Sequence, residues 1–237
     1  MDNDSSELTP HCALLTFVDI DATSEGGFGG AIANFGVASV HNSTFSDSNV
    51  LGPGGGIVNV GTLDVKNCRF STNFTDNGGG IASSGKLTVE NSIFAPLNSA
   101  RSFAGGGLFV SGDSASVKNS AFSQNVAPRG GGIANFAELE LINSTVSDNR
   151  AFQNNFGSPG QGGGIFNSGS LTIINSSVSG NEASQGGGIF NLGPLTLSNS
   201  FISDNTAEVG GGIYNQGTLF TLGDTIVTGN TPDNIAP

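Results

Sequence analysis

A repeat of about 24 residues runs through this chain and constrains its fold more than any other feature. One copy, GGGIFNLGPLTLSNSFISDNTAEV, spans residues 186–209, and the next copy begins at Gly210 with GGGIYNQGTL. The first large apolar residue of each copy recurs at steps of 25, 24, 27, 25, 32, 24 and 24 residues. A period of this length indicates a solenoid, in which each repeat buries its apolar face by stacking on its neighbours. These apolar residues are Ile32, Ile57, Ile81, Leu108, Ile133, Ile165, Ile189 and Ile213.

Within each copy the apolar pattern is that of short strands. Apolar and polar residues alternate, as in Leu171/Ile173 and Leu195/Leu197, with the two-residue period of a strand. Each burst ends at Gly or Asn, which tolerate left-handed backbone conformations. Left-handed hexapeptide helices and calcium-binding nonapeptide rolls have shorter coils. We therefore predict an all-β fold, a right-handed parallel β-helix (solenoid) of about eight three-sided coils with about 24 residues per coil.

The repeat divides the chain into two parts. Residues 26–237 form the predicted β-helix repeat domain, and residues 1–25 hold no full copy, so we expect an N-terminal cap or incomplete coil there. No capping helix is recognisable, and open sheet ends need protection, so we expect the chain to be part of a longer one. Residues 12–18 lack the basic flank of a signal peptide, and no stretch reaches the ~18 apolar residues of a membrane helix. We therefore expect any export signal to lie outside this chain and no membrane insertion by this segment.

Asparagine recurs in three columns of the aligned copies. A stacked column of amides can satisfy the backbone of each turn and hydrogen-bond to the next coil, so we expect these columns to be structural ladders. Asn42, Asn143 and Asn175 also match the N-glycosylation sequon, and burial in a ladder would make them unavailable as acceptors. The first column is Asn42, Asn67, Asn91, Asn119, Asn143, Asn175 and Asn199; the second is Asn49, Asn73, Asn125, Asn149, Asn181, Asn205 and Asn230; the third is Asn34, Asn59, Asn135, Asn167, Asn191 and Asn215.

The charged residues and cysteines limit the possible partners. The formal charge is −12, and all seven basic residues lie between Lys66 and Arg150. This balance repels phosphate backbones, so we expect no nucleic-acid binding. Two cysteines, Cys12 and Cys68, do not make a disulfide framework, and no cysteine spacing is typical of a metal site. We expect no metal and no cofactor.

Several segments resemble bacterial surface proteins. GGAI at 29–32, with FSTN at 70–73 and FSQN at 122–125, resembles the paired GGA(I/L/V) and FxxN motifs of chlamydial polymorphic outer membrane protein passengers. GGGIFNSGSLTIINSSVSGN at 162–181 is similar to large repeat proteins of cyanobacteria and other environmental bacteria. The resemblance covers residues 26–235 and is to bacterial surface right-handed parallel β-helix repeat proteins. It implies export, surface display and, in the chlamydial members, adhesion, although a fold does not by itself fix a function.

Two inserted loops mark a candidate ligand-binding side. The long steps of 27 and 32 residues add residues before a Gly triplet, in the segments 95–104 and 150–161. Loops inserted at one corner of a solenoid line up on one side, which is often the binding side. Arginines on successive coils with nearby phenylalanines suggest a patch that holds an anionic or carbohydrate ligand; alternatively, the rings pin the loops and the arginines are solvated. The residues concerned are Arg101, Phe103, Arg129, Arg150, Phe152 and Phe156.

A second candidate is a column of rings. The residue after the inward Ile of each copy should face outward, and on three successive coils it is Phe166, Phe190 and Tyr214. Sugar rings and partner proteins stack on such strips, although cross-strand packing alone would also account for one.

Polysaccharide lyases and glycoside hydrolases of this fold are the enzymatic alternative. A hydrolase needs two carboxylates across a groove, but Asp64 and Glu140 are three coils apart and Asp148 and Asp204 are two coils apart. His41 has no obvious acid–base partner. We therefore assign no catalytic residues and predict a secreted or cell-surface solenoid that serves as an adhesion or binding scaffold. Its partner is expected to be a polysaccharide or a host or partner surface protein.

Overall fold

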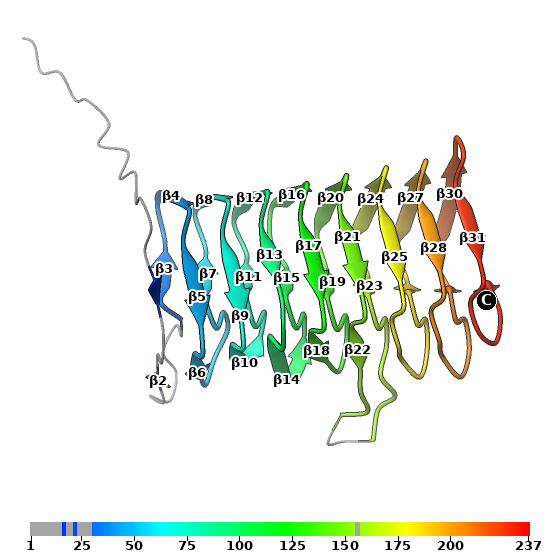
Figure 1. Ribbon diagram of the computed structural model, residues 1–237, viewed down its shortest axis with the longest axis horizontal. Coiled ribbons are helices and arrows are strands. Elements are labelled where there is room, and N and C mark those ends of the chain that lie inside the picture. The colour runs from blue at the N-terminus through cyan, green and yellow to red at the C-terminus, as the bar shows by residue number, and fades with distance from the viewer. Residues whose placement is uncertain (1–15, 18–20, 23–29, 155–156) are drawn as a thin grey trace, which may run out of the picture.

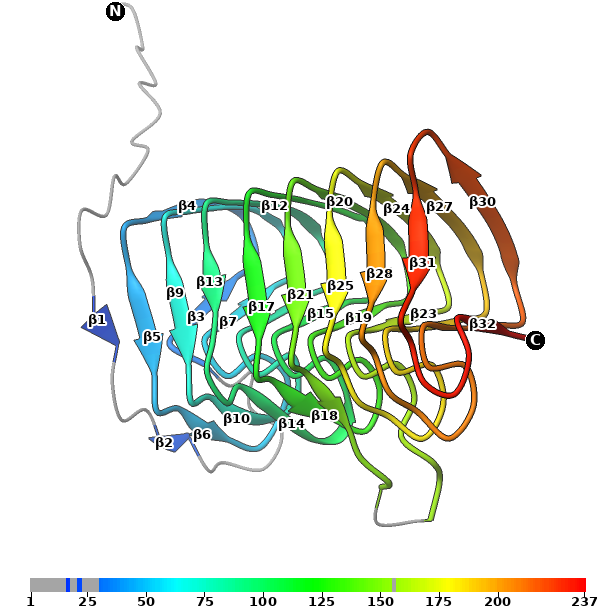
Figure 2. The same ribbon diagram turned by 45° about the vertical axis from the view of Figure 1, so that its right-hand side comes forward.

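The computed structural model describes residues 16–17, 21–22, 30–154 and 157–237, and every paired strand among them lies parallel to its neighbours one coil away (Figure 1). No helix occurs in these residues. Figures 1 and 2 show the chain advancing from the N-terminal to the C-terminal end with a right-handed turn. The predicted all-β right-handed parallel β-helix of about eight coils is confirmed, although four sheets make up the coils where three sides were expected.

Four parallel sheets run along the solenoid, three long and one short. Sheet D carries the Ile that follows each Gly triplet and contains β3 Ile32–Asn34, β7 Ile57–Asn59, β11 Ile81–Ser83, β15 Leu108–Val110, β19 Ile133–Asn135, β23 Ile165–Asn167, β26 Ile189–Asn191, β29 Ile213–Asn215 and β32 Ile235–Ala236. Sheet A follows it with five-residue strands: β4 Val37–His41, β8 Thr62–Lys66, β12 Lys86–Glu90, β16 Ser114–Lys118, β20 Glu138–Ile142, β24 Ser170–Ile174, β27 Pro194–Ser198 and β30 Thr218–Leu222.

The other two sheets complete each coil. Sheet B contains β1 Thr16–Phe17, β5 Thr44–Ser46, β9 Arg69–Ser71, β13 Ile93–Phe94, β17 Ala121–Ser123, β21 Thr145–Ser147, β25 Ser177–Ser179, β28 Phe201–Ser203 and β31 Ile226–Thr228. Sheet C is short and contains β2 Asp21–Ala22, β6 Asn49–Val50, β10 Phe74–Asn77, β14 Ser99–Ala104, β18 Val126–Ala127 and β22 Arg150–Ala151. In the region predicted as a cap, β1 and β2 pair with β5 and β6 of the first coil. The rest of residues 1–25 lies outside the described residues.

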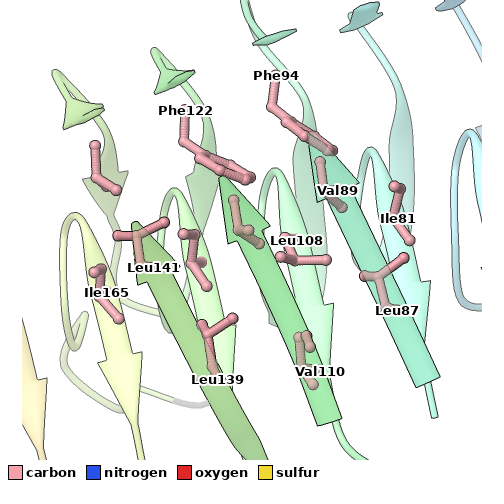
Figure 3. Packing of buried hydrophobic residues seen from close by; sticks show 14 of the residues in the cluster. Ile81, Leu87, Val89, Phe94, Leu108, Val110, Phe122, Leu139, Leu141 and Ile165 are labelled. Atoms are coloured by element: carbon pink, nitrogen blue, oxygen red, sulfur yellow. The ribbon is translucent and has the colours of Figure 1, made fainter. Parts of the chain in front are cut away.

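Columns of like apolar side chains fill the interior. Phe45, Phe70, Phe94 and Phe122 are fully buried on sheet B and stack with ring centroids 4.8, 4.6 and 4.4 Å apart, which is the rise of one coil. They lie in one core cluster with the inward Ile and Leu side chains of sheets D and A (Figure 3). The narrow core needs few residue types, because each coil repeats the environment of the one before it.

The Gly triplets allow one coil to lie close against the next. At Gly162 the backbone is left-handed, with a φ of +67°, and an added Cβ would come within 2.2 Å of the Ile165 carbonyl oxygen. At Gly163 it would come within 2.5 Å of the Gly187 carbonyl oxygen in the next coil. Any side chain at these positions would push the corner open, which explains why the triplet recurs.

The third predicted asparagine column is a buried ladder, as expected. Asn135 donates to Asn167 at 2.8 Å, and Asn167 donates to Asn191 at 2.7 Å. The amides also donate to carbonyls of the following turn, such as Asn135 to the Ser170 oxygen at 3.0 Å. Each amide thus ties its own corner to the next coil.

The second column is also a buried ladder, but its first members differ from the prediction. Asn73 accepts from the Ser48 backbone N–H at 3.2 Å and donates to Asn98 at 2.8 Å. Ser48 therefore holds the place that the sequence assigned to Asn49, and Asn49 is exposed. Asn98 was missed because one more residue separates it from Phe94 than separates Asn73 from Phe70.

The first column does not form a buried ladder, and that expectation was wrong. Asn143 and Asn175 are exposed at a left-handed turn, with φ of 48° and 49°. The buried ladder of this corner is made by the serines that follow them: the Ser144 backbone N–H donates to the Ser176 hydroxyl at 3.0 Å. Burial therefore does not shield the sequons at Asn42, Asn143 and Asn175.

Candidate binding surfaces

Both inserted loops lie on the sheet C side of the solenoid. The first adds one residue before Asn98 and two after it, and forms β14, whose register against β10 shifts between Thr75 and Asn77. The second leaves the coil after β22 and projects below the neighbouring coils in Figure 1. Its backbone returns to the solenoid where the Gln161 N–H donates to the Pro128 oxygen at 3.1 Å.

The three predicted arginines lie on this side but have different surroundings. Arg101 hydrogen-bonds to Asn49, and its guanidinium lies 6.0 Å from the Phe74 ring centroid. The Nε of Arg150 lies 3.7 Å from a carboxylate oxygen of Glu182 on the next coil.

Arg129 stands directly before a Gly triplet, over aromatic rings. Its guanidinium carbon lies 5.3 Å from the Phe103 ring centroid and 5.6 Å from that of Phe166. Among the residues that the structure describes, its side chain has neither an ion-pair partner nor a hydrogen-bond partner. The three guanidinium groups therefore do not share one set of contacts, and within the described part of the chain Arg129 is the one without a polar partner.

The predicted column of rings forms a longer aromatic ladder on the outside of sheet D. Phe166, Phe190 and Tyr214 stack with centroids 5.5 and 5.0 Å apart. The ladder continues past Ala134 because the Phe136 ring takes the vacant place, 5.3 Å from Phe166. The full ladder consists of Phe103, Phe109, Phe136, Phe166, Phe190 and Tyr214. The sequence pattern missed Phe136, although the small residue two positions before it leaves the gap that its ring fills.

The rings of this ladder differ in their exposure to solvent. Phe166 and Phe190 are each only 3% exposed, whereas Phe103 is 39% exposed. Tyr214 and Phe152 are half-buried, and Phe156 lies outside the described residues. The buried rings support the surface from below, so a ligand would meet Phe103 first and then the half-buried side chains beside it, which are Phe109, Arg129, Phe136 and Tyr214. We call Arg129, Phe103 and the ladder beneath them the corner surface.

The ladder ends beside a hollow over the N-terminal coils. Where the ring column changes to Val58 and Ala82, the outer face of sheet D has an apolar depression of about 230 Å³ bounded by Phe109. Its remaining walls include Pro53 and Val60. The small residues in this column thus leave a concave continuation of the aromatic ladder.

Sheet A carries a charged depression on its outer face. Ser114 and Ser116 on β16 form its low floor, and Lys86 on one side faces Glu138 and Glu140 on the other, in a volume of about 270 Å³. The Ser116 hydroxyl oxygen is buried and has no hydrogen-bond partner among the described residues. This carboxylate pair on one strand was not considered from the sequence.

The acids that were considered lie as far apart as expected. The strand register places Asp64 and Glu140 three coils apart. His41, however, does have an acidic neighbour, because its Nε2 lies 3.0 Å from Asp64. That expectation was wrong, since it did not count the side chain one coil away. Among the described residues no cluster of three or more His, Cys, Asp or Glu side chains is suited to a metal ion.

Comparisons with known proteins place the chain in no family, since no family model, no curated protein and no solved structure matches it. Within the residues described there is no helix long and apolar enough to cross a membrane.

Proposed function

We propose that this chain is a non-catalytic, secreted or cell-surface solenoid that binds acidic glycans at the corner surface. The observation that carries the proposal is Arg129, whose guanidinium lies over two rings without a polar partner among the described residues. The cation–π attraction of the two rings holds the guanidinium in place and leaves its N–H groups for a carboxylate or sulfate.

The local charge favours an acidic ligand despite the net charge of −12. Residues 66–150 hold seven basic and six acidic residues, a balance of +1, whereas the rest of the chain holds thirteen acidic residues and no Lys or Arg. Arg129, Phe103, Phe109 and Phe136 of the corner surface lie in this stretch, so an approaching polyanion meets less repulsion at that end of the surface. The exposed Phe103 ring can also pack against the apolar C–H face of a sugar while the guanidinium beside it takes the acidic group.

Affinity electrophoresis in native gels that contain polygalacturonate, hyaluronate or chondroitin sulfate tests the proposal. Arg129→Gln is compared with Arg150→Gln, which makes the same change of charge on the same side of the solenoid. Retardation of the wild type and of R150Q by at least one acidic glycan, lost in R129Q, supports the proposal. Equal retardation of both variants, or free migration of the wild type in every acidic gel, overturns it.

A second candidate is a glycoside hydrolase with its site on sheet A. The Cα atoms of residues two apart on a strand are about 6.6 Å apart on one face, and two carboxyl groups about 6.5–9.5 Å apart are typical of inverting glycosidases. Glu138 and Glu140 are two residues apart on one face of β20, and both border the charged depression. Reducing ends released from a polysaccharide by the wild type, but not by Glu138→Gln or Glu140→Gln, would establish this activity. Absence of release across the polysaccharides tested removes it.

A further inference from the structure

The outer face of sheet B carries a groove that the corner surface does not use. Two adjoining depressions of about 430 and 340 Å³ share Asn143 and Thr145 and together run from Asn91 to Asn199. One wall is the exposed asparagine column, and beside it lies a column of mostly small residues. We call this the asparagine groove, and its lining residues are Asn91, Asn119, Asn143, Asn175, Asn199, Ile93, Ala121, Thr145, Ser177 and Phe201, with the serines between the two columns as its floor.

The amides at the centre of this column are not used by the fold. The turns are held by the buried serine ladder, in which the Ser120 backbone N–H donates to the Ser144 hydroxyl at 3.0 Å. The side chains of Asn119, Asn143 and Asn175 make no hydrogen bond among the described residues. Only toward the ends does the column make such bonds, as where Asn67 donates to Asn42 at 3.0 Å. These central amides thus remain available to a ligand.

Backbone conformation alone does not explain why asparagine holds this position on seven successive coils before Gly223 takes it on the eighth. A second left-handed turn closes sheet B at its other end, with φ between 55° and 66°. There five residue types occur on eight coils, including Thr72, Leu97 and Gln124. At the groove, seven successive coils carry Asn with φ between 48° and 54°. Other residue types adopt the same left-handed conformation at the other end of sheet B. The recurrence of asparagine at the groove therefore points to a use of the amide itself.

The spacing and charge of the groove define the kind of ligand. The five asparagines stand at coil intervals of about 4.8 Å, a span of roughly 19 Å, and one interval is close to the length of one sugar ring in an extended chain. A primary amide both donates and accepts, as a sugar hydroxyl does. No charged side chain lines either depression. The exposed Ile93 and Phe201, 42% and 50% exposed, close the groove with apolar surfaces that suit the faces of terminal rings.

We infer that the asparagine groove binds a neutral linear polysaccharide that runs along the solenoid axis, with one sugar per coil. Each central amide hydrogen-bonds to hydroxyls of one sugar, and Phe201 stacks on the ring at its end. This site lies on a different face from the corner surface and takes an uncharged ligand, so the two proposals stand or fall separately.

Glycine substitution tests the amides without disturbing the turn, because Gly adopts the left-handed conformation readily. The variant Asn119→Gly/Asn143→Gly/Asn175→Gly is compared with Thr72→Gly/Gln124→Gly, which makes uncharged changes at the other left-handed turn. Both are run in native gels containing barley β-glucan, xylan, glucomannan or hydroxyethyl cellulose, after far-UV circular dichroism has confirmed the fold. Phe201→Ala is a third variant that keeps every amide.

The expected result is retardation of the wild type by at least one neutral glycan, with an apparent Kd raised about tenfold or more in the triple glycine variant. Phe201→Ala also weakens binding, whereas T72G/Q124G and R129Q bind as the wild type does. Free migration of the wild type in all neutral gels overturns the inference, as does equal retardation of the triple glycine variant. R129Q separates the sites, because failure of the corner surface leaves neutral-glycan binding intact.

Discussion

Replacing Asn149 with alanine removes one step of the buried asparagine ladder, and the structure sets the size of the effect. Asn149 Oδ1 accepts two bonds from Asn125, one from its backbone N–H at 2.9 Å and one from its side-chain amide at 3.0 Å. Asn149 is 1% exposed and Asn125 is fully buried. The substitution therefore leaves two buried donors without an acceptor.

A buried donor left unpaired costs about 1–3 kcal/mol, so two such donors lower the free energy of unfolding by about 2–6 kcal/mol. The side-chain amide of Asn149 also donates to the Phe122 oxygen at 2.9 Å and to Asn181 at 3.0 Å. Both bonds are lost as well, which places the effect toward the upper part of that range. Each asparagine of the buried ladder is then needed to accept the buried N–H groups of the coil before it.

Urea denaturation followed by far-UV circular dichroism measures the change, since the chain has no tryptophan. Asn143→Gly is the matched control, because it removes an exposed amide one corner away and should change stability by no more than about 0.5 kcal/mol. A loss below about 1 kcal/mol for Asn149→Ala, or equal losses for the two variants, would contradict the view that the buried ladder holds the coils together.

Four further predictions concern the core, the buried cysteine and sheet A. Phe94→Ala, which removes a fully buried ring from the middle of the stack, should lower the free energy of unfolding by about 3–5 kcal/mol, measured by the same denaturation. Burial raises the pKa of the Cys68 thiol, so in a Cys12→Ser background Ellman's reagent should leave Cys68 unmodified in the native state at pH 8 and modify it in urea; rapid native labelling of that variant would contradict the burial of Cys68. Because the unfolded thiol ionises at lower pH than the folded one, Cys68 contributes stability that is present below the ordinary thiol pKa and lost as pH rises above it, and Cys68→Ser should flatten that alkaline decline. Glu138→Gln should leave retardation by acidic glycans unchanged if sheet A is separate from the binding surface, and a loss of retardation would show that it is not.

The coils could be predicted because the same pattern of glycine, apolar and asparagine residues recurs in each copy of the repeat. Inward Ile after each Gly triplet, alternating strands and Asn at the turns agree with one another, so the period alone defines the register from coil to coil. The ladder that includes Asn135 and Asn167 follows directly from that register.

The sequence pattern fails where two polar columns lie next to each other at a turn. Asn143 and Ser144 are adjacent, and period alone does not tell which one turns inward. The left-handed φ at Asn143 points its amide outward and places Ser144 in the ladder. Ser48 shows the same limit, since a serine can take the ladder position that asparagine holds elsewhere.

The surfaces were less predictable because they depend on contacts between coils. Phe136 enters the aromatic ladder only because Ala134 is small, and Asp64 reaches His41 only across one coil. The burial of Phe166 and Phe190 likewise depends on neighbouring coils, whereas the sequence indicates only that they face away from the main core. The asparagine groove was not predicted, because a column of recurrent asparagines in a solenoid is typical of a buried ladder and this column was assigned to one.

The central claim, that the corner surface binds acidic glycans, is tested most directly on a glycan microarray with the labelled chain, its R129Q variant and its R150Q variant side by side. The account predicts signals on uronic-acid or sulfated glycans for the wild type and R150Q that are absent for R129Q. Signals that persist in R129Q, or an array on which the wild type binds no acidic glycan, would contradict it.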